Sequence, residues 1–409
     1  MLSPSIITNI KKNGGSLSQV EINYIVNEYT AGNISNFEME NWLKAVFEEG
    51  MDYKETMYYT QSMVESGKQL DFSHLGGYVI DKHSTGGVGD KISLILGPVL
   101  AACGFYVPML AGRSLEHTGG TIDKLDAIPG FKTSLSIAEF IKNVEDVGIS
   151  IMSQSKEICP ADRKIYPLRS MTNTVSSIPL ICGSIMSKKI AEGIRGLIMD
   201  IKVGNGAFMH TIDAAKNLGK VLRKVGQSYG LNISINYTRM DQPLGNFSGL
   251  WCEVVESIEC LKGKGPADIM DIVYHLGING LKLAKIPNPK EKLKNVINNG
   301  DALNKFKEMV LAQGGDIDVL ENPSNIQPIY KEYILSECDG YINKMNTSHI
   351  GNAVILLGAG KLDVNDHLDP TAGIALLKKT GDYIRKGEPL LEYFCSKEGK
   401  LRKGKMYLQ

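Results

Sequence analysis

Two kinds of hydrophobic pattern divide the chain into a helical beginning and a longer part in which helices and strands alternate. In the first 65 residues the apolar positions recur with helical spacing. Ser18 and Glu21 have the spacing of a capping box, and Gly32 is placed to end the helix that they begin. Asn36 is placed to cap a second helix, whose apolar stripe consists of Met39, Trp42, Leu43 and Val46.

The pattern changes at Gly76, where a short β-branched and aromatic run over residues 76–81 predicts a strand. A glycine-rich loop follows, and a helix is expected from about Lys91. Residues 107–110 form another short apolar run, and residues 197–209 repeat the order of strand and glycine loop. A further helix is expected over residues 178–192. This alternation predicts an α/β unit with a buried, largely parallel sheet.

The last 80 residues alternate short strand-like runs with Gly and Asp turns, as in residues 338–345 and 387–394. This pattern predicts an α+β or β-rich cap. Residues 380–391 have the pattern of a β-hairpin.

Charge and composition indicate which kinds of molecule the protein would bind. Lys and Arg number 45 and Asp and Glu number 45, so no overall positive field would attract a nucleic acid or a membrane surface. We therefore expect small-molecule partners, no nucleic acid and no membrane. Glycine is unusually frequent, at 43 of 409 residues against a typical ~7%, and eleven glycines fall between Gly76 and Gly130.

The cysteines and the N-terminus favour a cytoplasmic protein. The seven cysteines include no Cys-x-x-Cys pair, which favours buried, reduced thiols over a zinc ribbon. The first 15 residues lack the basic-then-apolar order of a signal peptide. Residues 93–112 carry no charge, but Pro98 and Pro108 interrupt them, so a buried helix and a buried strand are expected there rather than a membrane span.

The strongest chemical signal lies in residues 81–90, which read Asp-Lys-His-Ser-Thr-Gly-Gly-Val-Gly-Asp. Glycines between a strand and a helix let backbone N–H groups converge on an anion. Lys82 adds a cation, and Ser84 and Thr85 add hydroxyl donors. The spacing matches neither a Walker loop nor a dinucleotide fingerprint. A tight turn that needs glycine for its backbone angles is the alternative.

A second glycine loop, residues 111–124, again follows a short apolar run. Two loops at the ends of neighbouring strands would form one pocket suited to inorganic phosphate. Arg113 and Asp123 either contact that ligand or form an ion pair that orients the loop.

Arg169, Ser184 and Lys188 form a third cluster. Ser184 and Lys188 are four residues apart on a predicted helix and share a face. A planar cation, a hydroxyl and an ammonium suit the edge of a polar heterocycle. A solvated helix face is the alternative.

Four segments, in this order and spacing, resemble the thymidine and pyrimidine-nucleoside phosphorylases. They are DKHSTGGVGD from residue 81, AGRSLEHTGGTIDKLDAIPGF from residue 111, PADRKIYPLRSMTNTVSSIPLI from residue 160 and SIMSKKIAEG from residue 184. The second matches the signature of that family, and the likeness covers nearly the whole chain. It implies reversible phosphorolysis of thymidine, which gives thymine and 2-deoxy-α-ribose 1-phosphate.

The resemblance also implies the architecture. The expected fold class is α/β, or α+β overall, with a small all-helical domain, a large α/β domain on a mixed, mostly parallel sheet, and a C-terminal α+β cap. The active site would lie in a cleft that closes by a hinge motion, in a homodimer. The expected domains are residues 1–64 with 160–192 (helical), 77–153 with 196–325 (phosphate-binding α/β) and 326–409 (C-terminal subdomain).

The resemblance assigns roles residue by residue. Arg169 and Lys188 would stabilise negative charge on the departing base, and His83 would hydrogen-bond or protonate its carbonyl O2. These three are the expected catalytic residues. Phosphate would be bound by Lys82, Ser84, Ser93 and Thr121. The pyrimidine would contact His83, Leu115, Arg169, Val175, Ile181, Ser184, Lys188 and Phe208.

The chain departs from the family pattern at several positions. Ala111 replaces a serine that donates to phosphate, and Ser114 and Glu116 replace glycines. The resemblance implies no metal and no organic cofactor, with phosphate as a co-substrate. Relatives that bind a potassium ion carry threonine where this chain has Lys91, which argues against potassium dependence.

Met109 stands where the broad-specificity enzymes carry lysine, and this favours a thymidine phosphorylase in pyrimidine salvage, with deoxyuridine as a second substrate. The nearest alternative is a broad pyrimidine-nucleoside phosphorylase that also cleaves uridine. Ala111 and Glu116 motivate an alternative of another class, a catalytically weakened relative with a binding or signalling role. An enzyme like anthranilate phosphoribosyltransferase would need a pyrophosphate–magnesium site, and the first glycine loop has no paired acidic motif for one.

Overall fold

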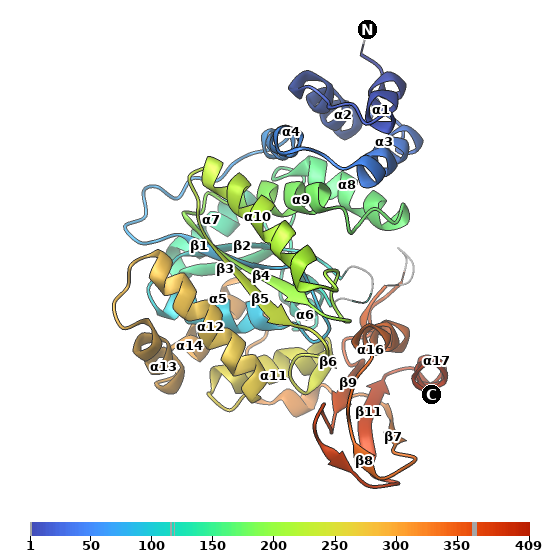
Figure 1. Ribbon diagram of the computed structural model, residues 1–409. Helices are drawn as coiled ribbons and strands as arrows, with labels where there is room; N and C mark the ends of the chain where they lie inside the picture. The colour runs from blue at the N-terminus through green and yellow to red at the C-terminus, as the bar shows by residue number, and fades with distance from the viewer. Residues whose placement is uncertain (1, 115–116, 118, 362–365) are drawn as a thin grey trace. The chain divides into compact units, whose positions relative to one another are not determined.

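The computed structural model describes residues 2–114, 117, 119–361 and 366–409 (Figure 1). The chain divides into two compact units, each assembled from segments that are separate in the sequence. The first, here called the helical unit, comprises Met1–Val79, Gln154–Leu197 and Lys216–Ile233. The second, here called the α/β unit, comprises Ile80–Ser153, Ile198–Ala215 and Ser234–Gln409.

Side-chain caps determine where the first helices of the helical unit begin. Ser18 and Glu21 form the expected capping box, and Gly32 ends that helix with a left-handed φ of 93°. Ser35, not Asn36, caps the next helix, because its hydroxyl accepts from the Glu38 N–H while the Glu38 carboxylate accepts from the Ser35 N–H. The helices that lie wholly within this unit are α1 (Pro4–Lys12), α2 (Gln19–Ala31), α3 (Asn36–Glu49), α4 (Tyr53–Glu65), α8 (Pro160–Met171) and α9 (Ile178–Ala191).

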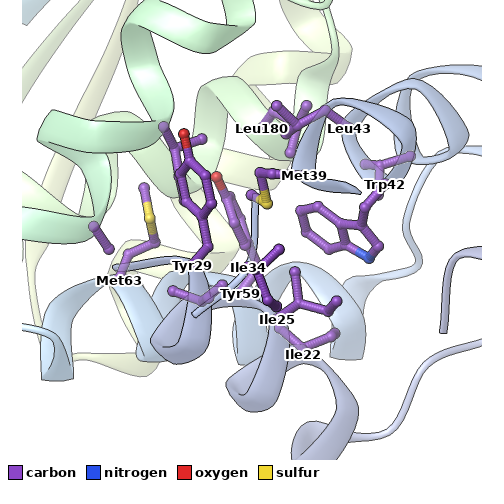
Figure 2. Packing of buried hydrophobic residues seen from close by; sticks show 14 of the residues in the cluster. Ile22, Ile25, Tyr29, Ile34, Met39, Trp42, Leu43, Tyr59, Met63 and Leu180 are labelled. Atoms are coloured by element: carbon purple, nitrogen blue, oxygen red, sulfur yellow. The ribbon is translucent and has the colours of Figure 1, made fainter. Parts of the chain in front are cut away.

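The core of the helical unit joins these N-terminal helices to α8 and α9, which come from much later in the sequence (Figure 2). The apolar stripe expected on α3 is fully buried. The ring centroids of Trp42 and Tyr59 lie 5.8 Å apart in this core. Helix α9 approaches α4 closely at Gly183, where an added Cβ would lie 2.4 Å from the Tyr59 ring. This close contact fixes the helix that carries Ser184 and Lys188.

A buried ion pair links α1 to α4 within the same unit. Lys11 Nζ lies 2.9 Å from Glu55 Oε1, and both side chains are almost fully buried. Glu55 also accepts from the backbone N–H groups of Leu17 and Asp52, at 2.9 Å and 2.8 Å. One carboxylate therefore holds together the end of α1, the loop after it and the start of α4.

Removing this carboxylate should destabilise the protein strongly. Glu55→Ala leaves the Lys11 ammonium buried without its charge partner, so we expect a loss of about 3–5 kcal/mol in the free energy of unfolding. Glu40→Ala, which removes the exposed partner of Lys44 on α3, should cost about 0.5 kcal/mol or less. Urea unfolding followed by circular dichroism measures both. Equal losses in the two variants would contradict the role given to Glu55.

The central strands of the α/β unit form two sheets, one with the order β1-β4-β5 and one in which β2 and β3 pair in parallel. The strand predicted over residues 76–81 instead begins at Ile80 and ends at Ser84, so Lys82, His83 and Ser84 lie on a strand and not in a loop. The strand extends through these polar residues because Lys82 and Ser84 have buried partners in Asp90 and Ser93. The strands are β1 (Ile80–Ser84), β2 (Val107–Ala111), β3 (Ile149–Ser153), β4 (Gly196–Val203) and β5 (Asn232–Arg239).

The uncharged segment that follows the first glycine loop forms a buried helix and a buried strand, as expected. Every residue of α5 (Ile92–Ala102) is buried except its last, Ala102, although Pro98 lies inside the helix. None of the helices in the described residues is both long and apolar enough to cross a membrane.

The other helices between β2 and the C-terminal strands are α6 (Thr121–Leu125), α7 (Ile137–Val147), α10 (Ile212–Ser228), α11 (Trp251–Leu261), α12 (Ala267–Leu283), α13 (Pro289–Asn298), α14 (Asp301–Ala312) and α15 (Asp318–Glu321), with the short 3-10 turn η1 (Pro323–Asn325).

The C-terminal residues add an antiparallel sheet of order β6-β9-β11-β7 and a small two-stranded sheet of β8 and β10. The hairpin expected over residues 380–391 is wrong, because its first arm pairs with β8 while its second arm pairs with β7 and β9. The elements are β6 (Phe247–Gly249), β7 (Tyr330–Leu335), β8 (Gly340–Tyr341), α16 (Thr347–Val354), η2 (Ile355–Ala359), β9 (Gly373–Leu376), β10 (Tyr383–Ile384), β11 (Pro389–Cys395) and α17 (Glu398–Leu408).

These two units confirm the predicted fold class: a helical unit, a larger α/β unit with mixed sheets, and α+β structure at the C-terminal end (Figure 1). All seven cysteines are free, and most of them are buried, as the sequence predicts.

Candidate active site

Three of the four predicted phosphate-binding residues gather around Asp90 in the α/β unit. Ser84 Oγ, at the end of β1, donates to Asp90 Oδ2 at 2.5 Å. Lys82 Nζ, two residues earlier on the same strand, lies 3.9 Å from Asp90 Oδ1 and donates to Ser93 Oγ at 3.4 Å. Ser93 belongs to the first turn of α5. We call Lys82, Ser84, Asp90 and Ser93 the cation cluster.

Asp90 is the anchor of this cluster. Burial by itself raises the pKa of Asp90, but the ammonium groups of Lys202 and Lys82 and the hydroxyl of Ser84 outweigh it and hold that pKa well below its usual range. Lys202 Nζ lies 3.8 Å from Asp90 Oδ2, and Lys124 Nζ donates to the Asp90 carbonyl at 2.7 Å. Asp90 is therefore a fixed negative charge around which several cations and donors are arranged.

Lys82 differs from the other buried lysines of this unit in how weakly it is paired. Lys91, Lys124 and Lys202 each have a carboxylate oxygen within 2.7 Å. Among the residues that the structure describes, the closest such oxygen to Lys82 lies at 3.9 Å. Burial, and then the charge of Lys202, lower the pKa of Lys82 despite the nearby Asp90, Asp200 and Asp81. A buried ammonium without a close counter-charge is a favourable place for an anion to bind.

Thr121, the fourth predicted phosphate residue, begins the short helix α6. This helix is attached to the cation cluster through Lys124, which donates to the Asp90 carbonyl and lies 2.6 Å from Glu253 Oε2. Before α6, Arg113 Nη1 contacts the carboxylates of Asp123 and Asp126, each at 2.7 Å. The loop-orienting ion pair considered for Arg113 and Asp123 is therefore formed. The predicted base contact at Leu115, and the departure at Glu116, lie outside the described residues.

His83 and Phe208 also lie in the α/β unit. Because side chains alternate along a strand, His83 faces the side of β1 opposite to that of Lys82 and Ser84. Phe208 follows β4, and its ring centroid lies 5.7 Å from that of His117. Nε2 of His117 lies 3.2 Å from the Gly206 carbonyl oxygen. His117 was not among the predicted residues, and its place within the second glycine loop is the sequence signal for it.

The predicted base-binding residues Arg169, Ser184 and Lys188 are all buried in the helical unit. Lys188 Nζ on α9 donates to Asp162 Oδ2 at 2.5 Å and to Ser184 Oγ at 3.0 Å. Arg169 on α8 donates to the carbonyl groups of Leu180 and Val175, at 3.0 Å and 2.7 Å. The alternative of a solvated helix face is therefore wrong, because the surrounding helices bury these side chains.

The two apolar residues predicted for the base site are placed differently. Val175 is buried, and it contributes its carbonyl group to Arg169 as well as its side chain. Ile181 is half-buried on α9, three residues before Ser184 and on the same face of the helix.

Two residues of this cluster were not predicted from the sequence. Asp162 positions Lys188, and the Tyr166 ring lies beside both cations, 5.7 Å from Lys188 Nζ and 6.0 Å from Arg169 Cζ. Asp162, Tyr166 and Arg169 are spaced by four and three residues on α8, so a search for polar residues sharing a face with Arg169 would have found them. We call Asp162, Tyr166, Arg169, Ser184 and Lys188 the base cluster.

The base cluster keeps donors available for a ligand. Arg169 Nε is buried and has no hydrogen-bond partner among the described residues. A guanidinium has five N–H donors, and the two contacts to carbonyl groups leave three of them. Tyr59 borders the cluster, and burial raises the pKa of its hydroxyl, which keeps it neutral. The cluster therefore suits a ring with oxygen acceptors that gains negative charge.

Three domain models match the chain. The helical bundle domain of the glycosyl transferase family matches residues 5–67, its a/b domain matches residues 76–303, and the pyrimidine nucleoside phosphorylase C-terminal domain matches residues 341–404. The first two matches place the chain among the glycosyl transferases. The third match narrows this class: the chain belongs to the thymidine and pyrimidine-nucleoside phosphorylase family.

Individual relatives support the same family. The pyrimidine-nucleoside phosphorylase of Staphylococcus epidermidis is 42% identical over 386 residues, which cover 93% of this chain and 89% of that protein. The protein of the same name from Bacillus subtilis is 42% identical over 393 residues, which cover 95% and 91%. The solved anthranilate phosphoribosyltransferase of Thermus thermophilus is 17% identical, with a TM-score of 0.56 over 75% of this chain and 99% of that one. This last likeness shows the fold alone.

The weak pairing of Lys82 leads to a prediction about anion binding. Inorganic phosphate should raise the thermal unfolding midpoint of the protein, and Lys82→Gln should remove most of that increase. Lys142→Gln, which removes an exposed lysine of α7, is the control and should leave the increase unchanged. Because the lowered pKa makes Lys82 lose its charge at a lower pH than an ordinary lysine, the increase should fade as pH rises into the alkaline range. An undiminished phosphate effect in Lys82→Gln would contradict this assignment.

Proposed function

We propose that this protein catalyses the phosphate-dependent cleavage of pyrimidine nucleosides and that its preferred substrates are thymidine and deoxyuridine. The observation that carries the proposal is the weakly paired, buried Lys82 beside the hydroxyl groups of Ser84 and Ser93. The names of the relatives in Staphylococcus and Bacillus support the reaction. The base cluster supports a pyrimidine as the leaving group.

In this proposal the cation cluster holds the nucleophile. Phosphate would accept from the Lys82 ammonium, from the hydroxyl of Ser93 and from Ser84 and Thr121. Asp90 would not bind phosphate itself, since two negative charges repel. Its role is to position Lys82 and Ser84. Ala111, which is buried at the end of β2, supplies no hydroxyl here, so the cluster binds phosphate with one donor fewer than the family pattern provides.

The bond changes then follow from the charges. An oxygen of phosphate forms the new bond to the sugar C1′, and the bond from C1′ to the ring nitrogen of the base breaks. The electron pair of that bond moves to the pyrimidine, where negative charge spreads onto the ring oxygens. Arg169 and Lys188 would stabilise this charge, and His83 would donate a hydrogen bond or a proton to O2 of the base. No electron is transferred to or from a cofactor in these steps, and phosphate is the only co-substrate.

The preference for thymidine and deoxyuridine is supported by Met109. This side chain is buried on β2, and its methyl group lies 3.7 Å from the Cβ position of Gly97 on α5. A packed thioether offers no hydrogen-bond donor to the 2′-hydroxyl that distinguishes uridine. A broad enzyme that also cleaves uridine is the second candidate, because the relatives are named for pyrimidine nucleosides in general.

We also infer a homodimer. The supporting observation is a set of large apolar side chains that are exposed on the first three helices: Ile6, Val20, Phe37 and Phe47.

The base cluster is tested by an ultraviolet assay of thymine release. We expect release to require phosphate, and we expect Lys188→Ala to lower kcat/KM for thymidine by about 10²–10³-fold, since it removes a donor that acts on charge developing in the transition state. Lys44→Ala, an exposed lysine of the same unit, should retain the wild-type value. Circular dichroism checks that both variants fold. Full activity in Lys188→Ala would contradict the assignment of Lys188 to the base site. No thymine release by the wild type would favour the alternative of a binding protein.

The substrate preference is tested on the wild type. We expect kcat/KM for thymidine to exceed that for uridine by at least about 10-fold, a difference of roughly 1.4 kcal/mol in transition-state free energy. Deoxyuridine should behave like thymidine, since the two differ only by the methyl group of the base. Equal values for thymidine and uridine would establish the broad-specificity candidate instead.

A further inference from the structure

Lys91 lies immediately before α5, and its ammonium is enclosed by oxygen atoms. Its side chain is fully buried. Nζ donates to the carbonyl groups of Leu244 and Phe247, at 2.9 Å and 2.8 Å, and to Glu256 Oε2 at 2.5 Å. Glu253 Oε2 lies 4.0 Å away. We call these oxygens of Leu244, Phe247, Glu253 and Glu256 the oxygen cage.

The backbone around the cage is shaped to bring these oxygens close to one cation. Gly89 has a φ of 71°, and a Cβ there would lie 2.5 Å from the Leu244 carbonyl oxygen. Gly245 has a φ of 73°, and a Cβ there would lie 2.9 Å from Lys91 Nζ itself. Both glycines therefore provide a conformation and a space that other residues would deny. The backbone N–H groups of Asn246 and Phe247 donate to Glu256, which orients its carboxylate.

The charges in and beside the cage balance. Lys91 and Lys124 face Glu253 and Glu256, two positive charges against two negative charges, and Glu253 Oε2 lies 2.6 Å from Lys124 Nζ. Burial by itself lowers the pKa of Lys91, but the two glutamates outweigh it and raise that pKa, so the side chain stays charged. If the Lys91 charge were removed, the cage would lack one positive charge.

A monovalent cation is the group that such a cage would hold in the absence of Lys91. Backbone carbonyl groups can replace the hydration shell of potassium, and the cage distances of 2.5–2.9 Å are too long for the ~2.0–2.1 Å geometry of magnesium. The residues present do not fit a potassium ion, because the ammonium already occupies the centre of the cage. We infer that the tethered ammonium of Lys91 replaces a bound monovalent cation in this protein, which is therefore independent of such ions.

The position of the cage explains why a permanent cation matters there. Lys91 follows Asp90 directly, and Lys124 contacts both the Asp90 carbonyl and Glu253. The cage thus connects three parts of the chain: residues 244–247, which lead into β6, the helix α11, and the segment that anchors the cation cluster. Lys91 supplies the positive charge of the cage at any potassium concentration. This role does not depend on which substrate the enzyme takes.

The experiment compares chloride salts of potassium, rubidium and tetramethylammonium at equal ionic strength. Tetramethylammonium is the control ion because it is too large for the cage. Thermal unfolding of the wild type should be the same in all three salts. In Lys91→Thr, which opens the cage and leaves the glutamates unneutralised, potassium or rubidium should raise the unfolding midpoint by about 5 °C over tetramethylammonium. Lys91→Met fills the same space with an apolar chain and should show no such increase.

Two outcomes of the unfolding experiment would overturn the inference. One is an increase of several degrees for the wild type in potassium, and the other is a Lys91→Thr variant that folds but does not respond to any of the ions. Equilibrium dialysis of the wild type with rubidium keeps the test decisive if neither variant folds. We expect no stoichiometric rubidium binding, and one bound ion per chain would likewise overturn the inference.

Discussion

Seven lysines are buried in the described part of this chain, and the need to neutralise them governs its structure. Lys11, Lys91, Lys124, Lys188, Lys189 and Lys202 each have a carboxylate oxygen within 2.9 Å. Removing a charge from water costs several kcal/mol, so each pair is stable only where the backbone places the two groups accurately. In both units these pairs therefore act as positioning devices, and the functional side chains are attached to them.

Lys82 is the exception, and the exception coincides with the proposed function. Within the described part of the chain its nearest carboxylate oxygen lies at 3.9 Å, and that carboxylate, Asp90, is already shared with Ser84 and Lys202. An ammonium held in this state is ready to receive a second anion. Lys188 shows the opposite arrangement, because Asp162 and Ser184 fix its position firmly. A firmly positioned cation suits the stabilisation of charge that develops during a reaction, since it need not move when the charge appears.

Lys91 shows how one side chain can set the chemistry of a cage of oxygen atoms without changing the fold. The carbonyl and carboxylate groups around it are the kind that bind an alkali-metal ion, yet a side chain of the protein supplies the charge. Such a replacement requires a side chain of the right length just before α5. It also requires a glycine at 245, which leaves room for the ammonium, and a glycine at 89, which leaves room for the Leu244 carbonyl oxygen.

The sequence by itself determined the helices, the alternation in the middle of the chain and most of the side chains proposed to bind ligands. Capping residues and apolar spacing act over a few positions, so Ser18, Gly32 and the stripe on α3 were predictable. Lys82 and Ser84 were predictable as candidate site residues because they lie directly beside the first glycine loop in the sequence. Tertiary structure decided the rest. It extended β1 through Lys82 to Ser84 because Asp90 and Ser93 receive those side chains, and it separated the arms of the expected hairpin between two sheets. It also placed Asp162 beside Lys188 and Glu256 beside Lys91, 26 and 165 residues apart in the sequence. No local pattern encodes such pairs, because the low dielectric that makes them strong exists only once the surrounding chain has folded over them.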